Sequence, residues 1–230
     1  MQALASLYTA HFGCSPEEVI PITGSASNRS YFRMSSPAGR CIGVIGLDYD
    51  ENRAFLEIAR NFRIKDINVP EIFAAAADKM RYIQEDLGDD ILFDRYSRTG
   101  FTEESEALLC SVMATLPKLQ FEGAEGLDFS VCYPQPAFDR RMVMFDLNYF
   151  KYCFLKPSGV EFNEMLLQED FENFAEDLLS CMSDVPTFMY RDFQSRNVMI
   201  CDGKPYFIDF QGGRKGPVHY DVASFIWHAR

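Results

Sequence analysis

Three residues in the last fifth of the chain have the types and the spacing that phosphoryl transfer requires. Asn197 follows Asp192 by five positions, and Asp209 comes after a further short segment. Transfer from ATP needs a carboxylate that orients or deprotonates the attacking hydroxyl, and an amide oxygen and a second carboxylate that hold magnesium on the phosphates. The spacing matches the known catalytic-loop pattern. Asp192 is therefore the candidate base, and Asn197 and Asp209 are the candidate magnesium ligands.

The segment between these residues predicts the element that positions them. Two short apolar runs that favour strands flank Asp202-Gly203, which is a hairpin turn signal. A tight hairpin would bring Asn197 and Asp209 together at its open ends, as a shared metal ion requires. Taken singly, Asp192 could instead cap a helix and Asp209 could start a turn, because aspartate is common at both positions.

Length and composition allow one large packed domain or two small lobes with a cleft between them. The chain has 230 residues, of which 47% are hydrophobic, and its 21 Phe and 11 Tyr predict an aromatic core. No apolar run approaches the ~20 residues that span a bilayer. The first residues lack the basic segment of a signal peptide. We therefore expect a cytoplasmic protein with no membrane partner.

Charge and cysteine usage narrow the function further. The formal net charge of −12 argues against nucleic-acid binding. It would fit a cationic substrate, although many proteins are simply acidic. The seven cysteines are widely spaced, with no CxxC pair and no clustered histidine, so neither a zinc site nor a disulfide framework is expected.

The predicted elements form a strand-rich part followed by a helical part. We expect a helix over residues 3–13, a helix start at residues 15–18, and then five strands with one inserted helix. Beyond residues 87–89 the pattern becomes helical, and one helix is expected to start at Thr102. This order predicts an α+β fold with a nucleotide-binding lobe at 1–86 and a catalytic lobe at 87–230. The last predicted helix reaches Arg230 without a stop signal, so we expect a truncated chain with further helices beyond it.

The C-terminal motifs resemble those of the aminoglycoside phosphotransferase and choline kinase family. The resemblance is carried by residues 191–197, 208–212 and 216–224, and it covers most of the chain from about Ile20. It is closest to the bacterial branch that acts on N-acetylmuramate or N-acetylglucosamine. It implies a protein-kinase-like fold with a small antiparallel β lobe and a helical lobe. It also implies ATP and Mg²⁺ as cofactors, and a small-molecule hydroxyl, of a sugar or amino sugar, as the acceptor.

The resemblance also implies roles for residues outside the hairpin. The loop at residues 24–29 would cover the ATP phosphates, with Ser25, Ser27 and Asn28 as the contacts, although an ordinary turn is equally compatible with these residues. Glu85 and Leu87 would belong to the hinge that meets the adenine, or to a plain linker between the lobes. Asp221 would brace the catalytic loop, or cap the last helix.

Two departures from the family pattern bear on activity. Tyr190 stands where the family has a histidine, and tyrosine can keep both the hydrogen bond and the packing. The third strand, at residues 42–46, lacks the lysine that kinases place on the α- and β-phosphates and pair with a helix glutamate. The basic candidates to replace it are Arg29, Arg33, Arg40 and Arg53, and the helix carboxylate would be Glu51 or Glu57.

The acceptor side is less defined by the sequence. Residues 145–152 resemble a segment that lines it, where Asp146 or Asn148 could accept sugar hydroxyls, but an ordinary core helix with a polar outer face has the same pattern. Arg214 and Lys215 would either touch phosphate or face solvent.

The leading interpretation is an ATP-dependent small-molecule phosphotransferase. The alternative is a nucleotide-binding pseudokinase or regulatory module without turnover. The sequence predicts no oligomeric state.

Overall fold

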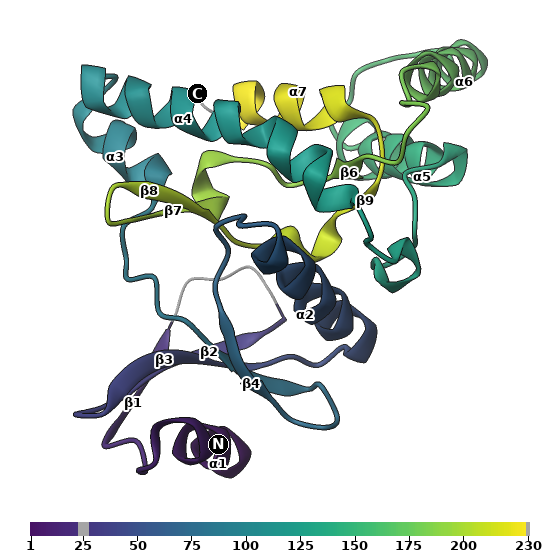
Figure 1. Cartoon of the computed structure of the whole chain (residues 1–230). Coiled ribbons are helices and arrows are strands. Elements are labelled where there is room, and N and C mark those ends of the chain that lie inside the picture. The colour runs from purple at the N-terminus through teal and green to yellow at the C-terminus, as the bar shows by residue number, and fades with distance from the viewer. Residues whose placement is uncertain (23–27, 229–230) are drawn as a thin grey trace.

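The computed structural model describes residues 1–22 and 28–228, which form a sheet-rich lobe and a helical lobe (Figure 1). The N-terminal lobe is a five-stranded antiparallel sheet in the order β1-β2-β3-β5-β4. Its elements are α1 (Gln2–Phe12), β1 (Glu18–Ile22), β2 (Ser30–Ser36), β3 (Gly39–Ile45), α2 (Tyr49–Ile64), β4 (Ile72–Ala75) and β5 (Arg81–Gln84). The predicted five strands with one inserted helix are confirmed.

The central strand β3 is buried because a helix covers each face of the sheet. Cys41 packs with Leu4 and Tyr8 of α1, whereas Ile42 and Val44 belong to the cluster that includes α2. Alternate side chains of a strand point to opposite faces, so both faces of β3 are apolar. From Cys41 to Val44 the strand is therefore buried, and its charged residue, Arg40, lies at the exposed start.

The predicted helix start at residues 15–18 is wrong. Glu18 is already paired with Ser35 as the first residue of β1. The run after it is rich in β-branched residues, and pairing with the long strand β2 outweighs the local helix-start signal.

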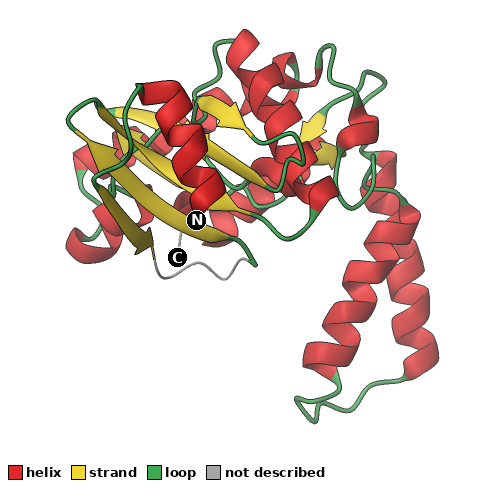
Figure 2. Ribbon diagram, turned by 90° about the horizontal axis from the view of Figure 1, so that it is seen from below, coloured by secondary structure: helices red, strands yellow, loops and turns green. Residues whose placement is uncertain are grey.

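The C-terminal lobe is mainly helical, with two small sheets, β6-β9 and β7-β8. Its elements are α3 (Leu92–Thr99), α4 (Glu103–Gln120), α5 (Arg140–Phe150), α6 (Glu164–Ser180), β6 (Phe188–Met189), β7 (Val198–Cys201), β8 (Lys204–Phe207), β9 (Arg214–Lys215) and α7 (Val218–His228). A π-helical turn, Lys151–Leu155, extends α5. The paired helices α5 and α6 project from the body of the molecule (Figure 2).

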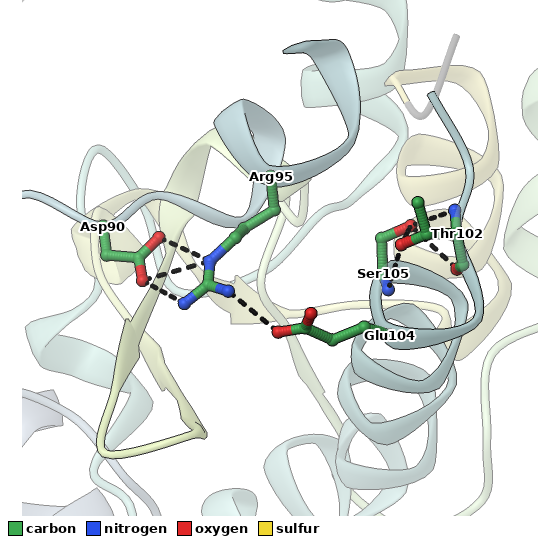
Figure 3. Close-up of polar contacts among 5 residues, drawn as sticks. All are labelled: Asp90, Arg95, Thr102, Glu104 and Ser105. Carbon is green, nitrogen blue, oxygen red and sulfur yellow. Dashed lines mark hydrogen bonds and ion pairs between the residues drawn. The ribbon is translucent and has the colours of Figure 1, made fainter. Parts of the chain in front are cut away.

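Polar contacts fasten the start of the helical lobe (Figure 3). The Arg95 guanidinium on α3 contacts Asp90, in the segment that enters the lobe, at 2.5 Å, and Glu104 on α4 at 2.9 Å. Thr102 and Ser105 form a reciprocal capping box at the start of α4, so the helix start predicted at Thr102 is confirmed.

One hydrophobic cluster extends through both lobes. Phe55 of α2 stacks on Phe210 at 4.9 Å between ring centroids, and Phe62 meets Phe188 edge-on at 5.1 Å. The lobe boundary between residues 86 and 87 remains a prediction. Within residues 1–22 and 28–228, no helix is both long and apolar enough to cross a bilayer.

Candidate active site

The hairpin between the candidate residues is present, because β7 and β8 pair antiparallel around Asp202-Gly203. Both turn residues have the positive φ angles of a two-residue hairpin turn, 50° and 71°. The Ile208 amide donates to the Asn197 carbonyl at 3.0 Å. The backbone at Asn197 therefore lies directly beside the residue that precedes Asp209.

Asp192 lies at the same place. The Asn197 side-chain amide donates to the Asp192 carbonyl at 2.9 Å. Burial by the surrounding protein and then the charge of Asp209 raise the pKa of the Asp192 carboxyl, so the two carboxylates are electrostatic neighbours. Both side chains retain access to solvent. A Cβ on Gly212 would lie 3.9 Å from Asp192 Oδ2, so the glycine keeps this side of the carboxylate open.

The backbone at both carboxylates has unusual geometry. Arg191, directly before the candidate base, has φ 76°, and Asp209 has φ 66°. Non-glycine residues seldom adopt this left-handed conformation, and such strain is concentrated at functional sites. The surrounding structure must therefore hold these residues in place.

Asp221 supplies part of that hold. Its fully buried carboxylate accepts hydrogen bonds from the backbone N–H groups of Tyr190 and Arg191, both at 2.9 Å, and from Gln120 Nε2 at 3.0 Å. Burial raises the pKa of Asp221 to about 6. The expected brace of the catalytic loop is what these contacts form. The alternative cap is wrong, because Asp221 lies inside α7.

Tyr190 keeps both the hydrogen bond and the packing, as expected. Its hydroxyl donates to the Ile208 carbonyl. Its buried ring lies against Phe193 and Phe210. The residue before the catalytic loop is therefore tied to the residue before Asp209.

A chain of contacts links Arg29 to Asp209. Arg29 Nη2 lies 3.4 Å from Glu51 Oε1, and the same Glu51 oxygen lies 3.5 Å from Gln211 Nε2. Gln211 Nε2 in turn donates to Asp209 Oδ1 at 2.6 Å. Gln211 was not anticipated from the sequence, where its only signal is its position two residues after Asp209.

The other candidates to replace the lysine have different partners. Arg33 and Arg40 both contact Asp86, at 2.9 and 3.5 Å. The alternative helix carboxylate, Glu57, pairs with Lys79 at 3.2 Å.

The residues predicted to contact the nucleotide lie in two segments, the loop before β2 and the segment after β5. Ser25 and Ser27 lie outside the described residues, and Asn28 is exposed just before β2. Glu85 follows β5, and its side chain accepts from the Glu71 amide at 3.1 Å. Leu87 is buried. Their contacts with a nucleotide remain predictions.

The acceptor-side segment meets the catalytic loop through one ion pair. Arg191 Nη2 contacts the Asp146 carboxylate at 3.0 and 3.3 Å. Phe145 and Tyr149 on α5 are exposed, at 62% and 64%. The outer face of this helix is therefore partly aromatic rather than polar, whereas Met142 and Val143 on the same helix belong to a buried hydrophobic cluster.

The solvent-facing alternative is wrong for Arg214, whereas its contact with phosphate remains a prediction. Arg214 is fully buried, and its guanidinium donates to the carbonyls of Gly212 and Tyr133 at 2.7 and 3.1 Å. Burial lowers the pKa of Arg214 to about 10. Its role is to hold the turn that follows Asp209.

The donor set fits a magnesium ion that shares its coordination with phosphates. Asn197 and Asp209 offer hard oxygen ligands, which Mg²⁺ prefers, and it takes few of them from protein when phosphates are present. The Gln211 Oε1 atom is buried and has no hydrogen-bond partner, although the other atom of the same amide, Nε2, donates to Asp209. Across the described residues, no group of three or more His, Cys, Asp or Glu is arranged to hold a metal.

Two surface hollows lie away from the candidate residues. One is lined by residues between Lys156 and Glu164, and another lies between the outer side of α2 and residues 126–131. Neither includes the candidate residues, which are therefore identified by their convergence.

Comparison with known proteins is consistent with this arrangement. The model of the phosphotransferase enzyme family matches residues 18–230. An N-acetylmuramate/N-acetylglucosamine kinase of Neisseria meningitidis serogroup B is 26% identical over 220 residues, which are 92% of this chain and 62% of the relative. A kinase of the same name from Pseudomonas aeruginosa is 27% identical over 211 residues, which are 90% of this chain and 59% of the relative. The chain thus spans about three fifths of the length of these curated relatives.

Solved structures share the fold. The aminoglycoside phosphotransferase APH(2'')-Ib in its ADP-bound form superposes with a TM-score of 0.63 at 17% identity, covering 94% of this chain and 73% of that one. The aminoglycoside phosphotransferase APH(4)-Ia gives a TM-score of 0.65 at 15% identity, covering 99% and 78%. The two-lobed α+β fold is therefore that of these phosphotransferases.

Proposed function

Because this chain belongs to the phosphotransferase enzyme family, we propose that it transfers the γ-phosphoryl group of ATP to a hydroxyl of a small molecule. The proposed acceptor is a sugar or amino sugar. Two curated relatives are named as kinases of N-acetylated sugars, which supports this acceptor class.

One observation carries the proposal: the convergence of Asp192, Asn197 and Asp209 around a single hairpin. The Ile208 backbone amide, directly before Asp209, donates to the Asn197 carbonyl, and the Asn197 side-chain amide donates to the Asp192 carbonyl. A carboxylate for the acceptor and a carboxylate–amide pair for a cation are the groups that this reaction requires.

Asp192 is the proposed general base. It accepts the proton of the acceptor hydroxyl, whose oxygen forms a bond to the γ-phosphorus as the bond to the β-phosphate oxygen breaks and ADP leaves. Burial and the neighbouring Asp209 raise the pKa of Asp192, which makes it a better proton acceptor than an ordinary aspartate.

Asn197 and Asp209 are the proposed ligands of Mg²⁺. When bound, the ion supplies neutralisation of the charge on the phosphate oxygens. The Asn197 Nδ2 atom donates to the Asp192 carbonyl, which directs the other end of the amide, its oxygen, away from that bond. Gln211 orients the Asp209 carboxylate by donating to Oδ1.

The proposed acceptor region is the side of α5 that meets the catalytic loop. Asp146 lies beside Arg191, one residue from the proposed base. Phe145 and Tyr149 are exposed on the same helix, and aromatic rings pack well against sugar faces.

A pseudokinase is the second candidate, because β3 contains no lysine. Such a protein would bind the nucleotide and transfer nothing.

An ATP-consumption screen tests the proposal. Amino sugars, N-acetyl sugars, choline and aminoglycosides are offered as acceptors to the protein and to its Asp192→Asn variant. We expect turnover with at least one sugar, and a loss of about 100-fold or more in the variant because general-base catalysis is removed. Mg-ATP binding is expected to be retained in the variant.

Two outcomes would contradict the proposal. Undiminished turnover in Asp192→Asn would exclude Asp192 as the base. Nucleotide binding without turnover on any acceptor would favour the pseudokinase.

A further inference from the structure

Several carboxylates lie close together at the site. Asp192, Asp209 and Glu51 all lie within the contact network described above. A nucleotide adds a charged phosphate chain to the same place. A phosphotransferase therefore needs a protein cation here besides the metal, and kinases supply it as a strand lysine paired with a helix glutamate.

We propose that Arg29 supplies this cation and binds the phosphate chain of the nucleotide, with Glu51 of α2 holding its guanidinium in place. The inference rests on the proposed function and assigns a residue to it. Arg29 directly precedes β2, so the cation comes from the residue next to the start of the strand that pairs with β3.

The contacts of Arg29 match the geometry of such a pair. Its side chain is 2% exposed, and the guanidinium contacts both the Glu51 carboxylate at 3.4 Å and the Glu51 carbonyl at 3.3 Å. It also lies over the Phe55 ring, 5.4 Å from the centroid. Through Gln211, Glu51 is one side chain removed from Asp209. A forked guanidinium suits this position, because it can bind a carboxylate and a phosphate together.

Two tyrosines place Arg29 and Asp209 in one neighbourhood. Tyr31 and Tyr82 flank Val44 of β3 in the register of the sheet. Burial raises the pKa of both tyrosines most, Arg29 opposes that rise, and Asp209 adds to it. The charge of Arg29 and the charge of Asp209 are therefore felt at the same two hydroxyls. The lysine is absent from the strand that runs between them.

The remaining candidates lie elsewhere. Arg33 and Arg40 contact Asp86 in the segment between the lobes. Arg53 lies on the outer side of α2, with residues 126–128. Arg29 is the candidate among these four that pairs with a helix glutamate connected to Asp209.

Paired titrations of adenosine and Mg-ADP test the inference. Both ligands carry the nucleoside, and only Mg-ADP carries phosphates, so the ratio of their dissociation constants isolates the phosphate contribution. We expect Arg29→Gln to weaken Mg-ADP binding about 10- to 100-fold, because a charge-assisted hydrogen bond is lost. Adenosine affinity should be unchanged. Arg53→Gln is the control: it also removes one positive charge, but from α2, and it should leave the ratio as in the wild type.

The ratio also separates binding from a purely structural role. Partial unfolding lowers both apparent affinities equally and leaves the ratio unchanged, so an unchanged ratio in Arg29→Gln overturns the inference. If Arg29→Gln does not fold, Arg29→Lys decides. This variant keeps the positive charge and loses the forked guanidinium. The preference for Mg-ADP over adenosine should therefore fall severalfold, and a wild-type preference would overturn the inference.

Wild-type titrations distinguish the two levels of the argument. Wild-type protein that binds neither ligand contradicts the proposed function and the inference together. If the wild type prefers Mg-ADP and the Arg29 variant shares that preference, only the role of Arg29 is contradicted.

Discussion

At the scale of single residues, the site contains two carboxyl groups whose pKa values are raised. Asp192 is raised by burial and by Asp209, and Asp221 is raised by burial to about 6. The first is the proposed base, and the second holds the backbone directly before it. Each has its own pH signature, one in the rate and one in the stability.

The rate signature follows from the protonation of Asp192. The base must be ionised, so kcat/KM for the acceptor should fall as the pH decreases. Because the pKa of Asp192 is raised, this fall should be centred above the ordinary aspartate value of about 4. The measurement is kcat/KM between pH 4.5 and 8.5 at constant ionic strength, with Mg-ADP affinity measured at each pH as the control. A profile that stays flat over this whole pH range would contradict the assignment.

The stability signature belongs to Asp221. Its pKa is about 6 in the folded protein and about 4 in an unfolded chain, so the folded state holds more protons between these values. The free energy of unfolding contributed by this group therefore falls as the pH rises through that window.

Urea unfolding of the wild type and Asp221→Asn, from pH 4.5 to 7.5, measures this contribution. The variant has no titrating group at the position, so the stability of the wild type relative to the variant should decrease with rising pH. An advantage that grows with pH would mean that the pKa of Asp221 is lowered.

Residue spacing could predict part of this site and could not predict the rest. Asp192, Asn197 and Asp209 belong to one continuous segment, so the hairpin between them was sufficient to predict their proximity. Gln211 and Glu51 are 160 positions apart in the sequence. Only the packing of α2 against the turn after Asp209 brings them together, and spacing carries no signal for that contact.

At the scale of elements, α5 is joined to the catalytic loop by the Arg191–Asp146 ion pair. Both side chains are partly exposed, so the pair should contribute little to global stability. Its effect should fall on position, because Arg191 directly precedes the proposed base in a strained conformation.

Replacing Asp146 separates these two effects. We expect Asp146→Ala to lower kcat roughly tenfold through misplacement of the loop, while the melting temperature and Mg-ADP affinity remain near wild type. Steady-state kinetics and thermal unfolding measure both. Glu176→Ala is the matched control, because it removes an exposed ion pair with Arg140 of the same helix. Equal losses of kcat in the two variants would contradict a special role for Asp146.

The elements also show where local patterns were sufficient. The capping box at Thr102 has its partners three residues apart, so sequence alone could place the start of α4. Residues 15–18 have an equally good local signal, but the partner of Glu18 is Ser35 on another strand. Long-range pairing decided the outcome there.

At the scale of the molecule, the aromatic face of α2 joins the two lobes. Phe62 is fully buried and lies against Phe188 and Phe210, both from the helical lobe. Since one core serves both lobes, we expect them to unfold together.

Calorimetry of Phe62→Ala tests this coupling. The variant should lose about 3–5 kcal/mol, the usual range for truncating a buried phenylalanine, and should still unfold in a single transition. Ile64→Ala, at a position 72% exposed on the same helix, should change stability by about 0.5 kcal/mol or less. Two separate transitions in the wild type would show that the lobes are independent.

The stack of Phe55 on Phe210 limits how far the sheet-bearing lobe can move from the helical lobe. Separating the two lobes would expose both rings to water, and exposing a large apolar surface to water costs free energy. Under the proposed function, turnover would then need only small adjustments near the phosphates, and the relative orientation of the two lobes would stay nearly constant.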